Sequence, residues 1–189
     1  MNVQEVLSTR DKLIAVAADL MERKGFFGLG INELLKTSGI PKGSLYHHFP
    51  GGKVALVEEA IKHSSKRRQK EYHEAMKGKK TVLEGIIAII DTLKEKLENT
   101  DFQYVCPISI IALEGADGNQ RIRESCKTAF EELETNFKAY LNLNGMDDAE
   151  YYAKVIINMI EGGILLAKAH HDIEHLETIK RYLPKLLKQ

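Results

Sequence analysis

The chain has little of what secreted and membrane proteins need. Its 189 residues contain two cysteines, four prolines and no tryptophan. Cys106 and Cys126 supply neither a disulfide framework nor a zinc ligand set. No apolar run approaches the roughly 18 residues that span a bilayer, and the stretch MNVQEVLSTR at the start has no apolar signal core. We therefore expect a protein of the reducing cytoplasm.

The sequence also lacks the motifs of the common enzyme classes. It contains no GxGxxG fingerprint and no Walker loop. It has no paired His, Cys and Asp set on a glycine elbow. We expect neither catalysis nor a cofactor.

The formal net charge is zero, but the charges are unevenly distributed. Residues 1–70 hold 12 Lys and Arg against 7 Asp and Glu, which gives +5. The remaining residues hold the other 15 basic and 20 acidic side chains, which gives −5. A basic N-terminal third followed by an acidic remainder favours contact with nucleic acid.

Apolar residues recur at helical spacing along the whole chain, and no segment alternates as a strand does. In the first helix Ser8 or Thr9 is the expected cap and Gly25 the expected end. Gly162 and Gly163 lie inside a later helical stripe and would weaken that helix, so they predict a close approach of another helix. The pattern predicts an all-α protein of about nine helices.

Residues 30–49 have the arrangement of a helix-turn-helix. Two short amphipathic segments are joined by SGIP, with a glycine in the turn. Pro41 is expected in the first turn of the second segment, where its missing N–H costs nothing. In such a pair the second helix enters the major groove of DNA with its N-terminal residues against the base edges.

The second segment, PKGSLYHHF, divides into a packing face and a polar face. Leu45 and Phe49 are four residues apart and are expected to pack on neighbouring helices. On the polar face, Lys42 offers a positive charge and Gly43 allows a close approach to the backbone. Ser44 offers a hydroxyl group, and Tyr46 and His47 offer polar rings. Lys53 and the N–H groups of a helix starting near Gly52 predict a phosphate site.

This part of the chain resembles the DNA-binding domain of TetR-family transcriptional repressors. The resemblance rests on the glycine-aromatic turn Gly25-Phe26-Phe27 and the run GIPKGSLYHHFPGGKVAL, and it covers about residues 8–61. The stretches PKGSLYHHFPGGK and VCPISIIALE are similar to the subgroup near the multidrug- and antibiotic-responsive repressors.

The resemblance implies a helical homodimer that binds a palindromic operator in double-stranded DNA. A small apolar or amphipathic inducer filling the C-terminal domain would release the DNA. The implied domains are a TetR-type DNA-binding domain at 6–66 and a ligand-binding and dimerisation domain at 67–189. By family position, the DNA-contacting set is matched by Lys42, Gly43, Ser44, Tyr46, His47 and Lys53.

Two positions depart from the family pattern. Gly30 stands where the family usually has a threonine that caps the helix, although glycine caps a helix with a loss of only a few tenths of a kcal/mol. Asn32 and Thr37 are the candidates for the polar contact that this threonine makes. Val105 stands where the subgroup has a glycine.

The C-terminal part is expected to hold the ligand and the dimer interface. The family arrangement implies a two-helix face on each subunit, and apolar stripes on 147–170 and 174–187 are compatible with it. The candidate pocket residues are Phe102, Tyr104, Cys106, Phe130, Phe137 and Met159. Pocket walls and packed cores use the same residue types, so the sequence leaves both roles open for them.

Three further features have a structural explanation that we favour. His171 and His175 are four apart, as zinc ligands can be, but they lie at an expected helix junction, so no metal site is expected. Cys126 lies on an apolar stripe and is expected in the core, which leaves Cys106 as the better candidate for an oxidant-sensitive thiol. The run KRRQK at 66–70 is expected to be a solvated helix face and not a second DNA contact.

Two other functions remain open at this point. One is a transcriptional activator of the same architecture. The other is a helical interaction module without sequence-specific DNA binding, which a test of sequence-dependent binding would distinguish from a regulator.

Overall fold

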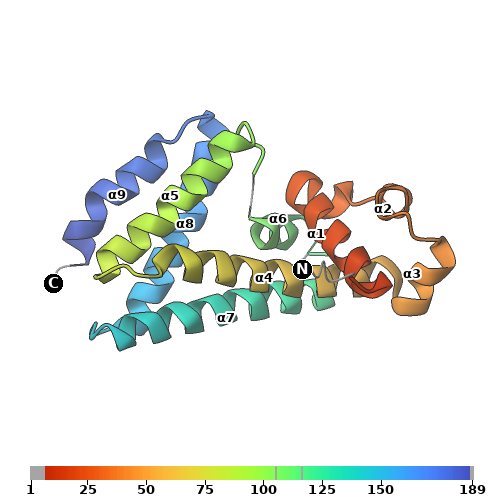
Figure 1. Ribbon diagram of the computed structural model, residues 1–189, viewed down its shortest axis with the longest axis horizontal. Helices are drawn as coiled ribbons and strands as arrows, with labels where there is room; N and C mark the ends of the chain where they lie inside the picture. Colours follow the sequence, from red (N-terminus) through yellow and green to blue (C-terminus); the bar gives the residue numbers. More distant parts are fainter. Residues whose placement is uncertain (1–6, 105, 116, 188–189) are drawn as a thin grey trace, which may run out of the picture. The chain divides into compact units, whose positions relative to one another are not determined.

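The structure, a computed structural model, describes residues 7–104, 106–115 and 117–187. Within these ranges the chain forms nine helices and no strand, so the predicted all-α class is confirmed (Figure 1). The helices are α1 (Thr9–Gly28), α2 (Ile31–Ser38), α3 (Lys42–His48), α4 (Gly52–Met76), α5 (Val82–Asn99), α6 (Pro107–Gly115), α7 (Gln120–Leu143), α8 (Ala149–His170) and α9 (Glu174–Leu186). Among the described residues, no helix combines the length and apolar character that crossing a bilayer requires. Val105 and the predicted domain start at residue 6 lie outside the described residues.

Helix α1 begins and breaks where the sequence predicts. Ser8 is the N-cap, and its hydroxyl accepts a hydrogen bond from the backbone N–H of Asp11 at 3.1 Å. Gly25 has φ +68° and ψ −167°, so the helix is interrupted there before it continues to Gly28. Glycine adopts such a backbone geometry without the steric cost that a side chain would bring. The break therefore falls at this residue.

The turn between α2 and α3 is held by Gly39 and Ser38. Gly39 ends α2 in the left-handed conformation at φ +67°, and its N–H donates to the carbonyl of Leu35 at 2.9 Å. The buried hydroxyl of Ser38 accepts a hydrogen bond from the N–H of Ile40 at 3.3 Å. Pro41 is the N-cap of α3 and not a residue of its first turn, because its ψ of 146° is extended.

The chain divides into two compact units. Unit 1 comprises the residues up to Ser65 together with Pro107–Ala129, and unit 2 comprises Lys66–Cys106 and Phe130–Gln189. Unit 1 thus contains α1, α2, α3, α6 and the first parts of α4 and α7. Each unit combines two separate segments of the sequence, whereas the predicted domains, 6–66 and 67–189, are each continuous. The division into a DNA-binding and a ligand-binding domain near residue 66 remains a prediction.

The core of unit 1 holds the two helices of the helix-turn-helix in place. Helix α1 packs on α2, α3 and α6. The fully buried side chains include Leu13, Met21, Leu34, Leu45 and Leu56. Since burying one such side chain contributes about 1.5–3 kcal/mol, this shared core stabilises helices that would not form alone.

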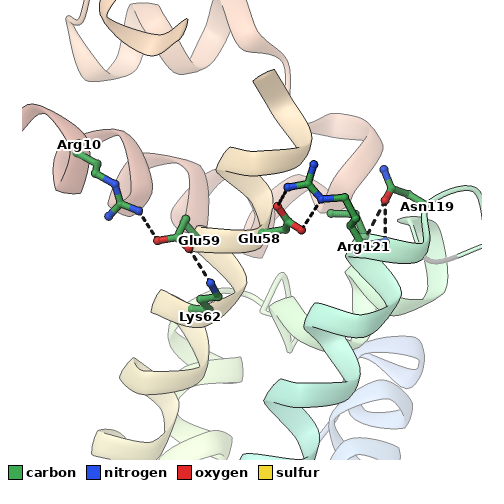
Figure 2. Close-up of polar contacts among 7 residues, drawn as sticks. Arg10, Glu58, Glu59, Lys62, Asn119 and Arg121 are labelled. Carbon is green, nitrogen blue, oxygen red and sulfur yellow. Dashed lines mark hydrogen bonds and ion pairs between the residues drawn. The ribbon is translucent and has the colours of Figure 1, made fainter. Parts of the chain in front are cut away.

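Ion pairs on unit 1 add contacts to α4. Figure 2 shows Glu58 facing Arg121 of α7, and Glu59 facing both Arg10 of α1 and Lys62. Arg121 Nε donates to Glu58 at 2.9 Å, and Lys62 Nζ donates to Glu59 at 2.8 Å. Hydrogen bonds from Lys62 and Arg10 lower the pKa of Glu59. The contribution of these two hydrogen bonds to the free energy of unfolding is therefore present at neutral pH, and it is lost as the pH falls through the lowered pKa of Glu59.

Unit 2 has its own core, formed by α5, α8 and α9 packed on one another. Its buried apolar side chains include Ile89, Leu93, Ile156, Ile160 and Leu176. A Cβ at Gly163 would lie 2.7 Å from Ile179 Cδ1 and 2.8 Å from Leu176 Cδ2, so α9 approaches α8 closely there. A Cβ at Gly162 would meet nothing within 4 Å. The predicted close approach is confirmed for Gly163, whereas no helix in the described part of this chain makes it at Gly162.

The run KRRQK at 66–70 is only partly the solvated face that the sequence predicts: Lys66 and Lys70 are exposed, but Arg68 is buried. The side chain of Arg68 is 6% exposed and forms an ion pair with Glu161 of α8. Its Nη1 donates to Cys106 Sγ at 2.7 Å, and its Nε donates to the hydroxyl of Tyr72 at 3.0 Å. The prediction was wrong for Arg68 because a run of charges does not reveal which member faces a carboxylate on a distant helix.

Replacing Arg68 with Met should lower the free energy of unfolding by about 3–5 kcal/mol, because it removes the cation opposite a mostly buried carboxylate. The measurement is a urea titration followed by circular dichroism. Lys24→Met is the control, since the Lys24 and Glu33 side chains of that ion pair are 47% and 40% exposed and its loss should cost about 1 kcal/mol or less. Equal losses in the two variants would show that burial does not set the contribution of Arg68.

Candidate DNA-binding surface and ligand cavity

Helix α3 is positioned by its two buried apolar side chains. It has seven residues, too few to be stable as an isolated helix. Leu45 is 0% exposed and Phe49 is 2% exposed, which confirms the predicted packing face. Tyr46, next to Leu45 in sequence, is 46% exposed. Packing on one side therefore leaves the polar side of α3 facing solvent.

The residues predicted to contact DNA lie on the accessible side of α2 and α3. The exposed ones are Asn32, Thr37, Lys42, Gly43, Tyr46 and His47, and Ser44 is half-buried. The part of the chain that the structure describes gives Lys42 no hydrogen bond or ion pair through its side chain. Glu33 is the one acidic residue between 30 and 57, and its carboxylate lies 2.7 Å from Lys24 Nζ. The surface therefore carries positive charge that suits a phosphate backbone.

Gly43 is a glycine that the fold of unit 1 does not require. A Cβ there would meet nothing within 4 Å, and its φ is not positive. Glycine also weakens a helix relative to alanine. A residue that costs helix stability and serves no packing within the chain is typical of a place where another molecule approaches the backbone.

Lys53 makes a contact that sequence reasoning missed. Its Nζ donates to the carbonyl of Phe26 at 2.7 Å and lies 4.6 Å from the centroid of the Phe26 ring. Partial burial lowers the pKa of Lys53, and the charge of Glu114 opposes that shift. An ammonium group has three N–H donors, so the contact with Phe26 leaves donors for a phosphate. The phosphate contact itself remains a prediction.

Glu114 of α6 binds the same turn of α1. Its Oε2 accepts hydrogen bonds from the backbone N–H of Phe26 at 2.7 Å and of Phe27 at 3.2 Å. A Cβ on Gly25 would collide with this carboxylate. The glycine-aromatic turn is thus held by a charged side chain 88 residues further along the chain. No local pattern links the two segments, so this contact has no signal in the sequence.

A cavity of about 570 Å³ lies in unit 2, between α4 and α7. Its polar lining residues are Lys66, Gln69, Lys70, His73 and Asn136. Its apolar and aromatic lining residues are Tyr72, Met76, Leu133, Phe137, Ala139, Tyr140 and Leu143. This volume lies within the range of sites for small organic ligands.

Of the pocket residues predicted from sequence, Phe137 alone lines this cavity. Tyr104 is buried in the core of unit 2. The side chains of Phe102, Phe130 and Met159 are partly buried and pack against that core. Cys106 is buried beside Arg68. The structure does not bring the six residues together in one lining. Sequence reasoning missed Lys66, Gln69 and Lys70 as lining residues, because it assigned the run KRRQK to a solvated helix face.

The histidines at the junction of α8 and α9 have separate neighbours. His171 Nε2 lies 3.3 Å from Asp101 Oδ1, and the rings of His170 and His175 lie 4.7 Å apart. Within the residues that the structure covers, no three His, Cys, Asp or Glu side chains gather in a way that would hold a metal ion.

Two family models match the chain. One, described as bacterial regulatory proteins of the tetR family, matches residues 13–60, which include α2 and α3. The other, described as the C-terminal domain of LmrA/YxaF-like transcriptional regulators, matches residues 82–182. The chain belongs to the TetR family of bacterial transcriptional regulators. The resemblance seen in the sequence is thereby confirmed, and a TetR-family protein is a regulator and not an enzyme.

Relatives of this TetR-family regulator match either most of its length or a part of it. The HTH-type transcriptional regulator LmrA of Bacillus subtilis is 32% identical over 183 residues, covering 96% of this chain and 97% of that protein. The HTH-type transcriptional repressor NemR of Escherichia coli is 43% identical over 61 residues, 31% of each chain. A TetR transcriptional regulator from Legionella pneumophila has a TM-score of 0.83 at 23% identity, covering 98% and 100% of the two chains, which shows the shared fold.

Gly43→Ala should separate binding from folding in this TetR-family regulator. The free energy of unfolding should stay the same or rise by up to about 1 kcal/mol, because alanine favours the helix. Affinity for the operator duplex should fall by about 1–3 kcal/mol, because the added methyl group would clash with DNA. Fluorescence anisotropy with labelled duplex measures the binding.

Gly118→Ala is the control for this prediction, because a Cβ there also meets nothing within 4 Å and the residue lies outside α2 and α3. It should leave the affinity unchanged. Parental affinity in Gly43→Ala would show that DNA does not approach the backbone of α3 at this point.

Proposed function

We propose that this TetR-family regulator is a transcriptional repressor. It binds a palindromic operator as a homodimer and releases the DNA when a small molecule occupies unit 2. The observation that carries the proposal is the polar face of α3, which the burial of Leu45 and Phe49 turns outward. Such a face, on the second helix of a helix-turn-helix, suits the major groove.

The residues of α3 divide into base-reading and backbone-contacting groups. Lys42 and Ser44 lie at the N-terminal end of α3, where side chains of a recognition helix reach base edges. Tyr46 and His47 lie further along α3, and Lys53 lies in the first turn of α4. All three are assigned to phosphates, which position the protein without reading sequence. Asn32 and Thr37 of α2 are assigned to the flanking backbone.

The proposed dimer uses α8 and α9. Large apolar side chains are exposed on both helices: Tyr151 at 64%, Leu165 at 57%, Leu166 at 41% and Tyr182 at 58%. An exposed apolar patch favours a protein interface. A palindrome requires two recognition helices related by twofold symmetry, and a homodimer supplies them.

Release follows from a difference in affinity between two states. A ligand shifts the equilibrium only if it has different affinities for the two states. Here it must bind more tightly to the state that does not fit the operator. Helix α4 has residues in both units and directly follows α3 in the chain. A displacement of its unit 2 part would therefore also displace its first residues, which follow α3. Two half-sites must be about one helical turn apart, roughly 34–36 Å, so a small displacement would disfavour binding. A protein with this role works in the bacterial cytoplasm, where the chromosome is.

Selection of binding sites from a random duplex library at about 0.15 M salt tests the proposal. We expect a palindrome whose half-sites are separated by about one helical turn. Recovery of no sequence above background would instead favour a helical interaction module. The recovered duplex then supplies the operator for a transcription assay, where increased transcript with protein present would identify an activator.

Leu165→Glu should disrupt the proposed dimer, because a carboxylate buried in an apolar interface costs several kcal/mol. Sedimentation velocity should show a monomer at concentrations where the parent is a dimer, and operator binding should weaken at least about tenfold. Leu113→Glu is the control, since Leu113 is 70% exposed on α6 and outside the proposed interface. A dimeric Leu165→Glu variant would contradict the assignment of this face.

A further inference from the structure

Helices α4 and α7 run side by side along the cavity of unit 2 in the same direction. Near one end, Asn136 Nδ2 donates to Gln69 Oε1 at 2.9 Å. Near the other end, Met76 and Tyr140 both approach Gly85 of α5. The lining residues of α4 therefore progress from Lys66 at the first end to Met76 at the second.

The first end of the cavity is cationic. Lys66, Lys70 and His73 follow one another at spacings of four and three residues, which places them on one face of α4. All three side chains are exposed. In the described part of the chain, none of them has a hydrogen bond or ion pair through its side chain.

Among the described residues that line the cavity, none is a carboxylate that would neutralise Lys66 and Lys70. On α4, Glu71 lies 3.5 Å from Lys96 and Glu74 lies 3.7 Å from Lys77, so both pair with lysines outside the lining. Glu132 approaches from α7, but its Oε2 contacts Gln69 Nε2 at 3.5 Å and it is not itself a lining residue.

The second end of the cavity is apolar. It is formed by Met76, Phe137, Tyr140 and Leu143. Burial raises the pKa of Tyr140, and the nearby charge of Glu84 raises it further. The Tyr140 hydroxyl therefore stays neutral, and Glu84 would repel an anion from this end.

We propose that the cavity binds a small organic anion, an apolar or aromatic body carrying one acidic group such as a carboxylate. The acidic group lies at Lys66 and Lys70, and the apolar body lies against Phe137 and Met76. The proposal rests on the proposed function, because it names the chemical class of the molecule that releases the DNA. Part of the run KRRQK thus belongs to ligand recognition.

A pair of dyes with the same apolar skeleton tests this charge preference. 8-Anilinonaphthalene-1-sulfonate carries a sulfonate, and N-phenyl-1-naphthylamine is the same skeleton without it. Fluorescence titration of the full chain, without DNA, gives both dissociation constants. In Lys66→Gln/Lys70→Gln the sulfonate should bind about 5- to 10-fold more weakly, since each exposed charge pair contributes up to about 1 kcal/mol. The neutral dye should change less than about twofold.

Lys79→Gln/Lys80→Gln is the matched control. It removes the same charge from two exposed lysines of unit 2 that do not line the cavity, and it should leave both dissociation constants unchanged. Thermal unfolding of each variant checks that the fold is retained, because these dyes also bind loosened apolar cores.

Three outcomes would overturn the proposal. They are unchanged sulfonate affinity in Lys66→Gln/Lys70→Gln, equal weakening of both dyes in that variant, or equal weakening of the sulfonate in the control. Site selection with DNA is a separate measurement, so failure of the operator proposal and failure of anion binding are told apart.

Discussion

The burial of Leu45 and Phe49 is the constraint on which the DNA-binding surface depends. Helix α3 is seven residues long and has too few internal hydrogen bonds to persist alone. Its position is therefore set by two side chains that are almost completely removed from solvent. The same packing decides which side chains face outward, so affinity for DNA and stability of unit 1 are linked through one small helix.

A second constraint acts on the turn that precedes the helix-turn-helix. Glu114 accepts hydrogen bonds from two backbone N–H groups of this turn, and Lys53 donates to the carbonyl of Phe26. The break at Gly25 is compatible with this arrangement because a side chain there would displace the carboxylate. Charged groups of α4 and α6 thus fix an α1 turn in place, and Lys53 combines this structural contact with the predicted phosphate contact.

In unit 2 the polar residues of α4 serve two different purposes. Arg68 points inward and joins α4 to α8 through Glu161, whereas Lys66 and Lys70 line the cavity. Since removal of one partner of a buried pair is costly, the Arg68 contact fixes this part of α4. The adjacent lysines can then present charge to a ligand from a well-defined helix face. Neighbours in one basic run therefore differ in role because successive helix residues point about 100° apart.

The sequence by itself determined the all-α class, the helix-turn-helix with its glycine turn, the packing pair Leu45 and Phe49, and the family. These features are encoded by short-range periodicity and by residues a few positions apart, so a single pass along the chain detects them. The tertiary structure alone decided the contacts of Glu114, the burial of Arg68 and the position of the cavity, which shares only Phe137 with the predicted pocket. Each of these depends on residues that are far apart in the chain, and local patterns carry no information about which distant side chains will meet.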